Sequence, residues 1–366
     1  TQAYRVLTNI QSINTEVINM LDDRKIKVLY AVIDSYLLTA EPIGSRTISK
    51  QYDLGVSSAT IRNEMSDLED LGYLNKPHTS SGRIPSDKAY RLYVDQMLKA
   101  KKLKIDMNKK EEIKRILTRE SKEIDQLIQN AAKILSAITS YTALAISPQL
   151  QKIKLKHIQL IPIDYSEILV VLVGDSGIVK NTIFRIEQEI PEEQLNRISN
   201  FLNHKLKGLT IDEIGKAMDY GIFEEIYEFK EIIDNIIPII NKSLEDVEDV
   251  EVYADGVTKI FNFPEYKDLD KAKSFISFIE DKDLLVDILL NNPIENGIEI
   301  TIGDENIYEP IKDCSLITTT YKLGDMTIGK IGVIGPTRMD YFTTINSLKL
   351  FSMNLTEILN MLFRKG

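Results

Sequence analysis

The first hundred residues alternate between apolar stripes at helical spacing and short polar breaks. Four apolar residues recur at intervals of four, three and three, which places them on one face of a helix: Ile61, Met65, Leu68 and Leu71. A similar stripe runs from Asp23 to Leu38, and Pro42-Ile43-Gly44 interrupts it before a shorter helical segment that begins at Ser45. The pattern predicts three successive helices joined by tight turns.

A β-hairpin is expected directly after the third helix. Tyr73-Leu74 begins one strand, Arg83-Ile84 begins the returning strand, and the residues between them are rich in proline, serine and glycine. Three helices followed by a hairpin form a winged helix-turn-helix, which places its third helix in the major groove of DNA. An ordinary capped surface helix remains the alternative when the third helix is considered alone.

Twelve polar residues are candidates for DNA contact, in three groups. In the major groove we expect the first turns of the third helix, because their side chains hydrogen-bond to base edges: Ser58, Thr60, Arg62 and Asn63. Phosphate contacts that fix the docking are expected from the second helix: Ser45, Arg46, Thr47 and Lys50. Contacts from the wing are expected near the hairpin tip: His78, Thr79, Ser81 and Arg83.

The distribution of charge supports a nucleic-acid partner for this segment alone. The whole chain has a net charge of -10, which by itself argues against a DNA-binding protein. Residues 23–104, however, contain 14 lysines and arginines against 10 aspartates and glutamates, whereas the rest contains 31 against 45. A mildly basic module is therefore attached to an acidic body, which discourages nonspecific coating of DNA.

Composition narrows the remaining classes of function. The single cysteine, Cys314, excludes an intrachain disulfide framework and fits a reducing cytoplasm, and no apolar run is long enough to suggest a membrane span. One cysteine and three scattered histidines do not suggest a zinc site or a Cys/His nucleophile. We expect no metal, no cofactor and no catalytic activity.

Two glycine-containing motifs lie in the second half of the chain. Gly324–Lys330 resembles a phosphate-binding loop, but Ile331 stands where a magnesium-binding hydroxyl is needed, so we expect a hairpin turn. Gly332–Tyr341 suggests a strand-to-helix junction. Within it, Arg338 and Asp340 are expected to serve packing or ion pairing, with ligand binding as the alternative.

The body of the chain is expected to be of mixed class. Lysines mark a linker at 96–114, and an apolar stripe predicts one long helix over 109–139. Strands are then expected over 157–186, helices from Pro191 to about 248 and again over 269–291, and strands with a last helix to the end. This order suggests an α+β domain interrupted by a helical insertion.

Two long segments carry a resemblance to a known family. Residues 57–95, SSATIRNEMSDLEDLGYLNKPHTSSGRIPSDKAYRLYVD, and residues 328–345, IGKIGVIGPTRMDYFTTI, resemble the heat-inducible transcription repressor family HrcA. Ser81 stands where that family commonly has alanine. The family's usual start resembles Met20–Arg24, so we expect residues 1–19 to be an upstream or vector-derived leader.

The resemblance implies both an architecture and a function. It implies an α+β multidomain protein with a winged helix-turn-helix at 20–95, a GAF-like α+β domain at 115–188 and 251–366, and an inserted, mainly helical dimerising domain at 189–250. It also implies a homodimeric repressor of chaperone genes that binds the CIRCE inverted repeat and whose activity depends on the GroE-type chaperonin. The alternative function is a regulator whose GAF-like domain senses a small molecule.

Overall fold

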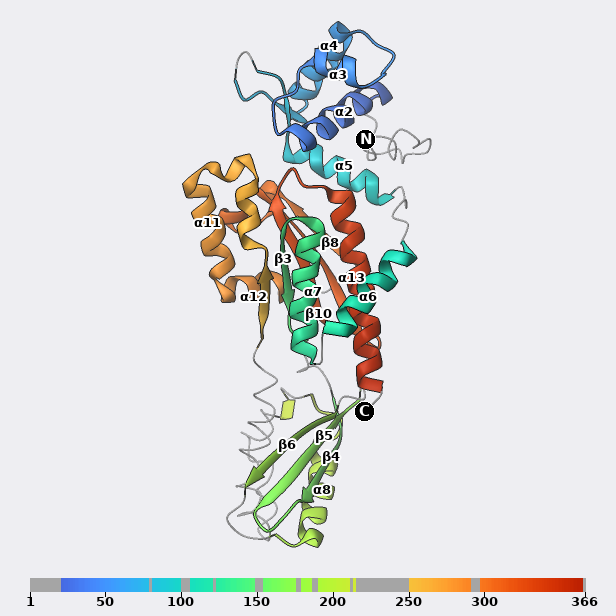
Figure 1. Ribbon diagram of the computed structural model, residues 1–366, viewed down its shortest axis with the longest axis vertical. Coiled ribbons are helices and arrows are strands. Elements are labelled where there is room, and N and C mark those ends of the chain that lie inside the picture. The colour runs from blue at the N-terminus through green and yellow to red at the C-terminus, as the bar shows by residue number, and fades with distance from the viewer. Residues whose placement is uncertain are drawn as a thin grey trace.

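The chain is elongated, with three parts that follow one another along its long axis (Figure 1). The computed structural model describes residues 21–78, 81–99, 106–120, 123–148, 154–175, 179–185, 190–210, 213–214, 250–290 and 297–364. The first part is helical with a small hairpin, the second contains a five-stranded sheet, and the third contains a three-stranded sheet. The expected mixed α+β class is confirmed.

The N-terminal part contains the three helices and the hairpin that the sequence predicts. Its elements are α2 (Asp23–Thr39), α3 (Ser45–Gln51), α4 (Ser58–Asp70), β1 (Leu74–Asn75), β2 (Ile84–Pro85) and a further helix, α5 (Asp87–Lys99). Ile61, Met65 and Leu68 of the predicted stripe are buried on one face of α4. The hairpin is tied to the loop before α3, because Ile43 and Arg83 exchange two backbone hydrogen bonds of 2.9 Å.

The expected long helix over 109–139 is wrong, because the structure has two helices there. These are α6 (Met107–Glu120) and α7 (Ile124–Thr139), and both pack against the C-terminal helix α13 (Tyr341–Arg364). Residues 118–123 are all polar, so the apolar stripe is interrupted between Leu117 and Ile124. As two separate helices, α6 and α7 both pack against α13.

A five-stranded antiparallel sheet forms the middle part. Its order is β7-β3-β10-β9-β8, and its strands are β3 (Thr142–Ile146), β7 (Val252–Asp255), β8 (Ile298–Ile302), β9 (Cys314–Leu323) and β10 (Met326–Pro336). Helices α7 and α13 cover one face, and α11 (Leu269–Glu280) and α12 (Lys282–Leu290) cover the other. Strand β3 was missed in the sequence. The expected hairpin turn is confirmed, because Leu323 pairs with Met326 across Gly324-Asp325.

A separate three-stranded sheet lies at the far end of the molecule. Strands β4 (Leu155–Pro162), β5 (Glu167–Gly174) and β6 (Val179–Arg185) pair with one another, and α8 (Glu192–Leu206) covers one face. The strands are where the sequence predicts them, but none of their described residues pairs with the five-stranded sheet. This pairing differs from the expectation that residues 115–188 belong to the same domain as the C-terminal strands.

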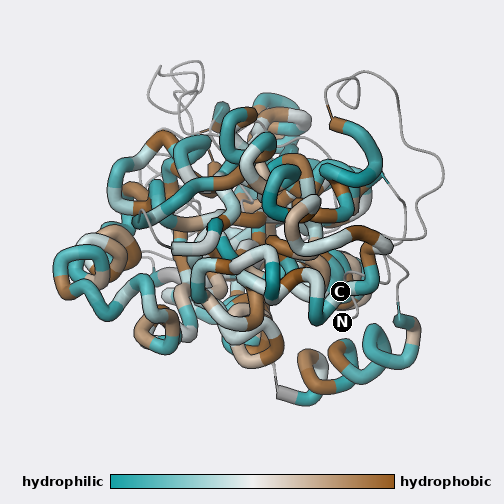
Figure 2. The backbone as a smooth tube through the Cα atoms, turned by 90° about the horizontal axis from the view of Figure 1, so that it is seen from above, coloured by the Kyte–Doolittle hydropathy of each residue, from teal (hydrophilic) through white to brown (hydrophobic). Residues whose placement is uncertain are grey.

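Helix surfaces follow the amphipathic pattern. Viewed from the N-terminal end, hydrophobic and hydrophilic colours alternate along the helices (Figure 2), as expected for helices that bury one face. Among the residues described above, no helix is both long and apolar enough to cross a membrane.

Candidate nucleic-acid interface

Helix α4 is built to present its first turns to solvent. The Ser57 hydroxyl accepts a hydrogen bond of 3.1 Å from the backbone N–H of Thr60 and so caps the helix. Ile61 and Leu68 are fully buried, which fixes the rotation of the helix about its axis. Arg62 and Asn63 therefore lie on the exposed side.

The structure places eleven of the twelve predicted contact residues. Six are exposed: Arg46, Thr47, Lys50, Arg62, Asn63 and His78. Five are half-buried: Ser45, Ser58, Thr60, Ser81 and Arg83. Thr79 lies outside the described residues. The exposed set contains three of the four predicted cations, Arg46, Lys50 and Arg62.

A hollow of about 330 Å³ brings together four of the predicted contact residues, with at least one from each of the three groups. It lies where the start of α3, the exposed side of α4 and the hairpin meet, and its polar lining is Ser45, Arg62, Lys76, Ser81 and Arg83. Lys76 was missed in the sequence, although it lies in the predicted hairpin beside Pro77. Arg62 and Lys76 have no ion-pair partner among the described residues, so their charges are available to an anion.

Two of the predicted wing residues, Ser81 and Arg83, also make contacts within the protein. Arg83 Nη2 lies 2.5 Å from Glu69 Oε2, which binds the hairpin to the last turn of α4. The Ser81 hydroxyl accepts from the backbone N–H of His78 at 2.9 Å and donates to the His78 carbonyl at 2.7 Å. These contacts hold the hairpin in place beside α4.

Three of the four acidic residues of α4 form ion pairs with cations. Lys25 Nζ lies 2.9 Å from both Glu64 Oε2 and Asp67 Oδ2, and these hydrogen bonds raise the pKa of Lys25. Together with the pair between Glu69 and Arg83, they compensate carboxylates that would otherwise repel phosphates. These three carboxylates therefore do not offset the charge of Arg62.

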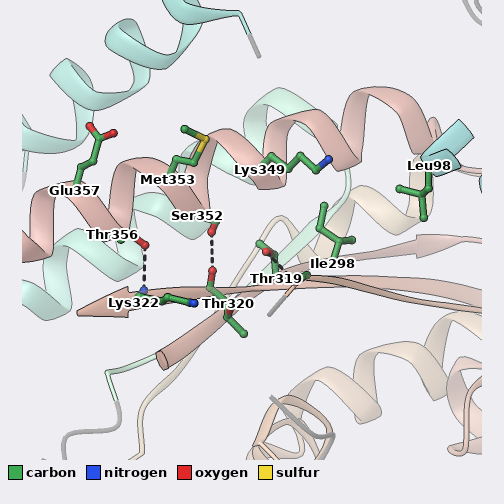
Figure 3. Close-up of a pocket in the computed structure, with 11 residues that line it drawn as sticks. Leu98, Ile298, Thr319, Thr320, Lys322, Lys349, Ser352, Met353, Thr356 and Glu357 are labelled. Carbon is green, nitrogen blue, oxygen red and sulfur yellow. Dashed lines mark hydrogen bonds between the residues drawn. The ribbon is translucent and has the colours of Figure 1, made fainter. Parts of the chain in front are cut away.

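A second hollow, of about 600 Å³, lies between α13 and the β8–β9 edge of the large sheet (Figure 3). Leu98, Ile298 and Met353 give it an apolar lining, and two lysines, Lys322 and Lys349, border it. Hydroxyls at this place are already engaged: Ser352 donates to the Thr320 carbonyl at 2.6 Å. Partial burial lowers the pKa of Lys349.

The other motif residues have structural roles. Arg338 forms an ion pair with Glu265 and stacks on Phe263, with its guanidinium carbon 5.4 Å from the ring centroid. Asp340 accepts the backbone N–H of Thr343 at 2.9 Å at the start of α13. The packing and ion-pair interpretation is thereby confirmed. Cys314 is fully buried, and burial raises the pKa of its thiol to about 12, which leaves it unreactive at neutral pH.

The chain is similar to known proteins over most of its length. The family model described as the HrcA protein C-terminal domain matches residues 125–345. The heat-inducible transcription repressor HrcA of Alkaliphilus metalliredigens is 43% identical over 93% of this chain and 98% of its own length. That of Ruminiclostridium cellulolyticum is 44% identical over 94% and 99%.

A solved structure shares the fold. The crystal structure of a hypothetical protein at 2.2 Å resolution superposes with a TM-score of 0.62 at 23% identity and covers 93% of this chain and 99% of its own. The sequence relatives extend over nearly the whole length of both chains, and the family model covers more than half of this one. The protein therefore belongs to the HrcA family.

Proposed function

We propose that this protein is a DNA-binding repressor of heat-shock genes that reads an inverted repeat of the CIRCE type with α4. The observation that carries the proposal is the hollow in which Arg62, Lys76 and Ser45 meet at the exposed side of a capped helix. Guanidinium and ammonium groups at such a place suit guanine edges and phosphates. The names of the relatives, heat-inducible transcription repressors, support the same function.

The α2–α5 part with its hairpin serves as the winged helix-turn-helix in this proposal. In that fold the second helix and the wing contact phosphates on either side of the helix in the groove. Arg46, Thr47 and Lys50 are exposed on α3, and His78 is exposed in the hairpin. The direct test measures anisotropy of a labelled CIRCE-type duplex and of a scrambled duplex over a salt series. Binding to the repeat alone supports the proposal, and equal binding to both contradicts it.

Dimerisation is proposed through an inserted domain between β3 and β7. These limits are wider than the expected 189–250. Strands β4, β5 and β6 share one hydrophobic core with α8, and this core is separate from the two hydrophobic cores of the rest of the molecule. The sheet face opposite α8 is the proposed contact with a second copy. It carries the exposed side chains of Ile161, Val179 and Ile183, and cross-strand pairing aligns Ile161, Leu169 and Ile183 in one row. Two-fold symmetry in the protein then matches two half-sites in the DNA.

Regulation by a GroE-type chaperonin completes the proposal. A repressor that depends on a chaperonin loses activity when heat diverts that chaperonin to unfolded clients. Adding chaperonin with ATP to the anisotropy experiment is expected to raise the fraction of protein competent to bind the repeat. An unchanged competent fraction would contradict this part of the proposal and leave DNA recognition intact.

The second candidate function is ligand sensing by the GAF-like middle part. The observation that favours it is the hollow between α13 and β8–β9, with an apolar lining and two lysines. The lining also includes Glu357, whose carboxylate is paired with Lys110 and Lys114. The two remaining lysines and the apolar side chains suit a small carboxylate with an apolar body. A ligand of this class is expected to raise the melting temperature of the full chain by mass action and to lose this effect in Lys349→Ala.

A further inference from the structure

Helix α5 is seated on the large sheet through two charged side chains. Asp87 Oδ2 accepts the backbone N–H of Asp304 at 3.1 Å. Arg91 Nη2 donates to the carbonyl of Ile300 at 2.6 Å and forms an ion pair with Glu305. These partners lie in β8 and in the 3-10 turn η6 (Gly303–Glu305) that follows it, and both elements belong to the middle part. The contacts of Asp87 and Arg91 with these elements form the joint between the N-terminal part and the middle part.

The turn η6 packs closely against the carboxylate of Asp87. Gly303 has a φ of +57°, and a Cβ atom at this position would lie 1.7 Å from Asp87 Oδ2. The carboxylate therefore occupies the space that any other residue's side chain would need. The side chain of Asn306 also stabilises the turn. Its Nδ2 donates to the carbonyls of Gly303, Ile311 and Cys314 at 3.0, 3.0 and 2.8 Å.

Tyrosines extend the contact on the buried side of α5. The rings of Tyr90 and Tyr341 lie 6.0 Å apart and connect α5 to α13, and those of Tyr30 and Tyr93 lie 5.6 Å apart and connect α2 to α5. Buried apolar residues form one continuous cluster from α2 and α4 through α5 to α7 and α13. A close-packed interior is hardly compressible. A shift of one helix in this cluster therefore displaces the helices packed against it.

The position of this joint matters because of the shape of the chain. Helix α4 lies at one end of the long axis, and the β4–β6 sheet lies at the other (Figure 1). In the dimer proposed above, a change in the angle at the joint changes the distance between the two copies of α4. A small rotation there moves both helices along the DNA.

We infer that Asp87 and Arg91 are positioning residues that set the half-site spacing the dimer can read. The inference rests on the proposed function and goes beyond it, because neither residue is a DNA contact. Rigid linkage makes binding of the second half-site intramolecular, and this advantage is lost when geometry forbids simultaneous engagement. Weakening the joint should therefore change the choice of spacing without changing the affinity for one half-site.

The experiment compares wild type with Arg91→Glu, Arg91→Lys and Arg115→Glu. Arg115 lies exposed on α6 without an ion-pair partner among the described residues, so Arg115→Glu makes the same charge change away from the joint. Each protein is titrated against a single half-site, the inverted repeat, and repeats whose spacer is longer or shorter by about 5 base pairs, half of a helical turn.

The joint predicts a distinctive pattern of affinities. Wild type and Arg115→Glu should prefer one spacer by at least about tenfold, whereas Arg91→Glu should lose about tenfold on that duplex and bind all spacers within about threefold. Its affinity for the half-site should stay unchanged, and Arg91→Lys should keep most of the preference. An unchanged spacing preference in Arg91→Glu, or an equal loss on the half-site, would overturn the inference. Failure of wild type to prefer the repeat over a scrambled duplex would overturn the proposed function instead.

Discussion

Gly303 and Gly324 have nearly the same backbone conformation, but only Gly303 lies against Asp87. Comparing alanine substitutions at the two positions therefore distinguishes backbone strain from the loss of the contact with Asp87. Gly303 has a φ of +57° and faces Asp87, whereas Gly324 has a φ of +59° and nothing within 4 Å of its added Cβ. Gly324→Ala should destabilise the fold by about 1–2 kcal/mol, since an L-residue is strained in the left-handed region. Gly303→Ala carries the same strain and also displaces the Asp87 carboxylate.

The second contribution at Gly303 follows from the contact. A Cβ at 1.7 Å from Asp87 Oδ2 forces the carboxylate away, and the hydrogen bond from the Asp304 N–H is lost. Hydrogen bonds to charged groups contribute about 1.5–3 kcal/mol. Gly303→Ala should therefore lower the free energy of unfolding by about 2.5–5 kcal/mol in total, clearly more than Gly324→Ala.

The assay is urea unfolding of the full chain by circular dichroism. A double-mutant cycle with Asp87→Ala adds the decisive control, because the shorter side chain removes the overlap. The Gly303→Ala/Asp87→Ala protein should be more stable than the sum of the two single effects predicts, by about 1–3 kcal/mol. Equal effects of Gly303→Ala and Gly324→Ala, or strict additivity in the cycle, would refute the reasoning.

Two further predictions concern the other parts of the molecule. Ile183→Lys should weaken the proposed dimer at least about tenfold in analytical ultracentrifugation, because it puts a charge into an apolar contact. The control Ile307→Lys, at an isoleucine that is 84% exposed elsewhere in the molecule, should leave the dimer unchanged. An intact Ile183→Lys dimer would place the contact on another face. Glu299→Ala should lower the free energy of unfolding by about 1–3 kcal/mol, since it removes the carboxylate that lies 2.9 Å from Nζ of Lys330, whose side chain is 2% exposed. Lys330→Met should have a smaller effect, and the reverse order in urea unfolding would contradict this explanation.

The sequence predicted the helices of the N-terminal part because each has an amphipathic stripe with clear breaks. The same rule failed where the signal was short or ambiguous. Strand β3 is five residues long and buried on both faces, so it shows no alternation that would distinguish it from the end of the preceding helix. The break after Leu117 cannot be read from the stripe, because the stripe resumes at Ile124, seven residues or two helical turns later.

Features that depend on long-range contacts were beyond the sequence pattern. Alternation along β4, β5 and β6 shows which residues face inward, but not with which strands they pair. Glu69 and Arg83 are separated by the hairpin's first strand and tip, and only the fold brings them to 2.5 Å. Lys76 is likewise a candidate contact only because of the fold. The hollow that it lines forms where α4 and the hairpin pack together.

The central claim is that α4 reads bases while the residues around it hold phosphates. The most direct measurement is anisotropy of the inverted repeat and a scrambled duplex with wild type, Arg62→Ala and Lys76→Ala over a salt series. Arg62→Ala should weaken binding to the repeat by about 1–3 kcal/mol and leave the scrambled duplex unchanged. Lys76→Ala should weaken both equally and flatten the salt dependence by about one charge. Equal losses on both duplexes in Arg62→Ala would contradict the claim that α4 lies in the major groove.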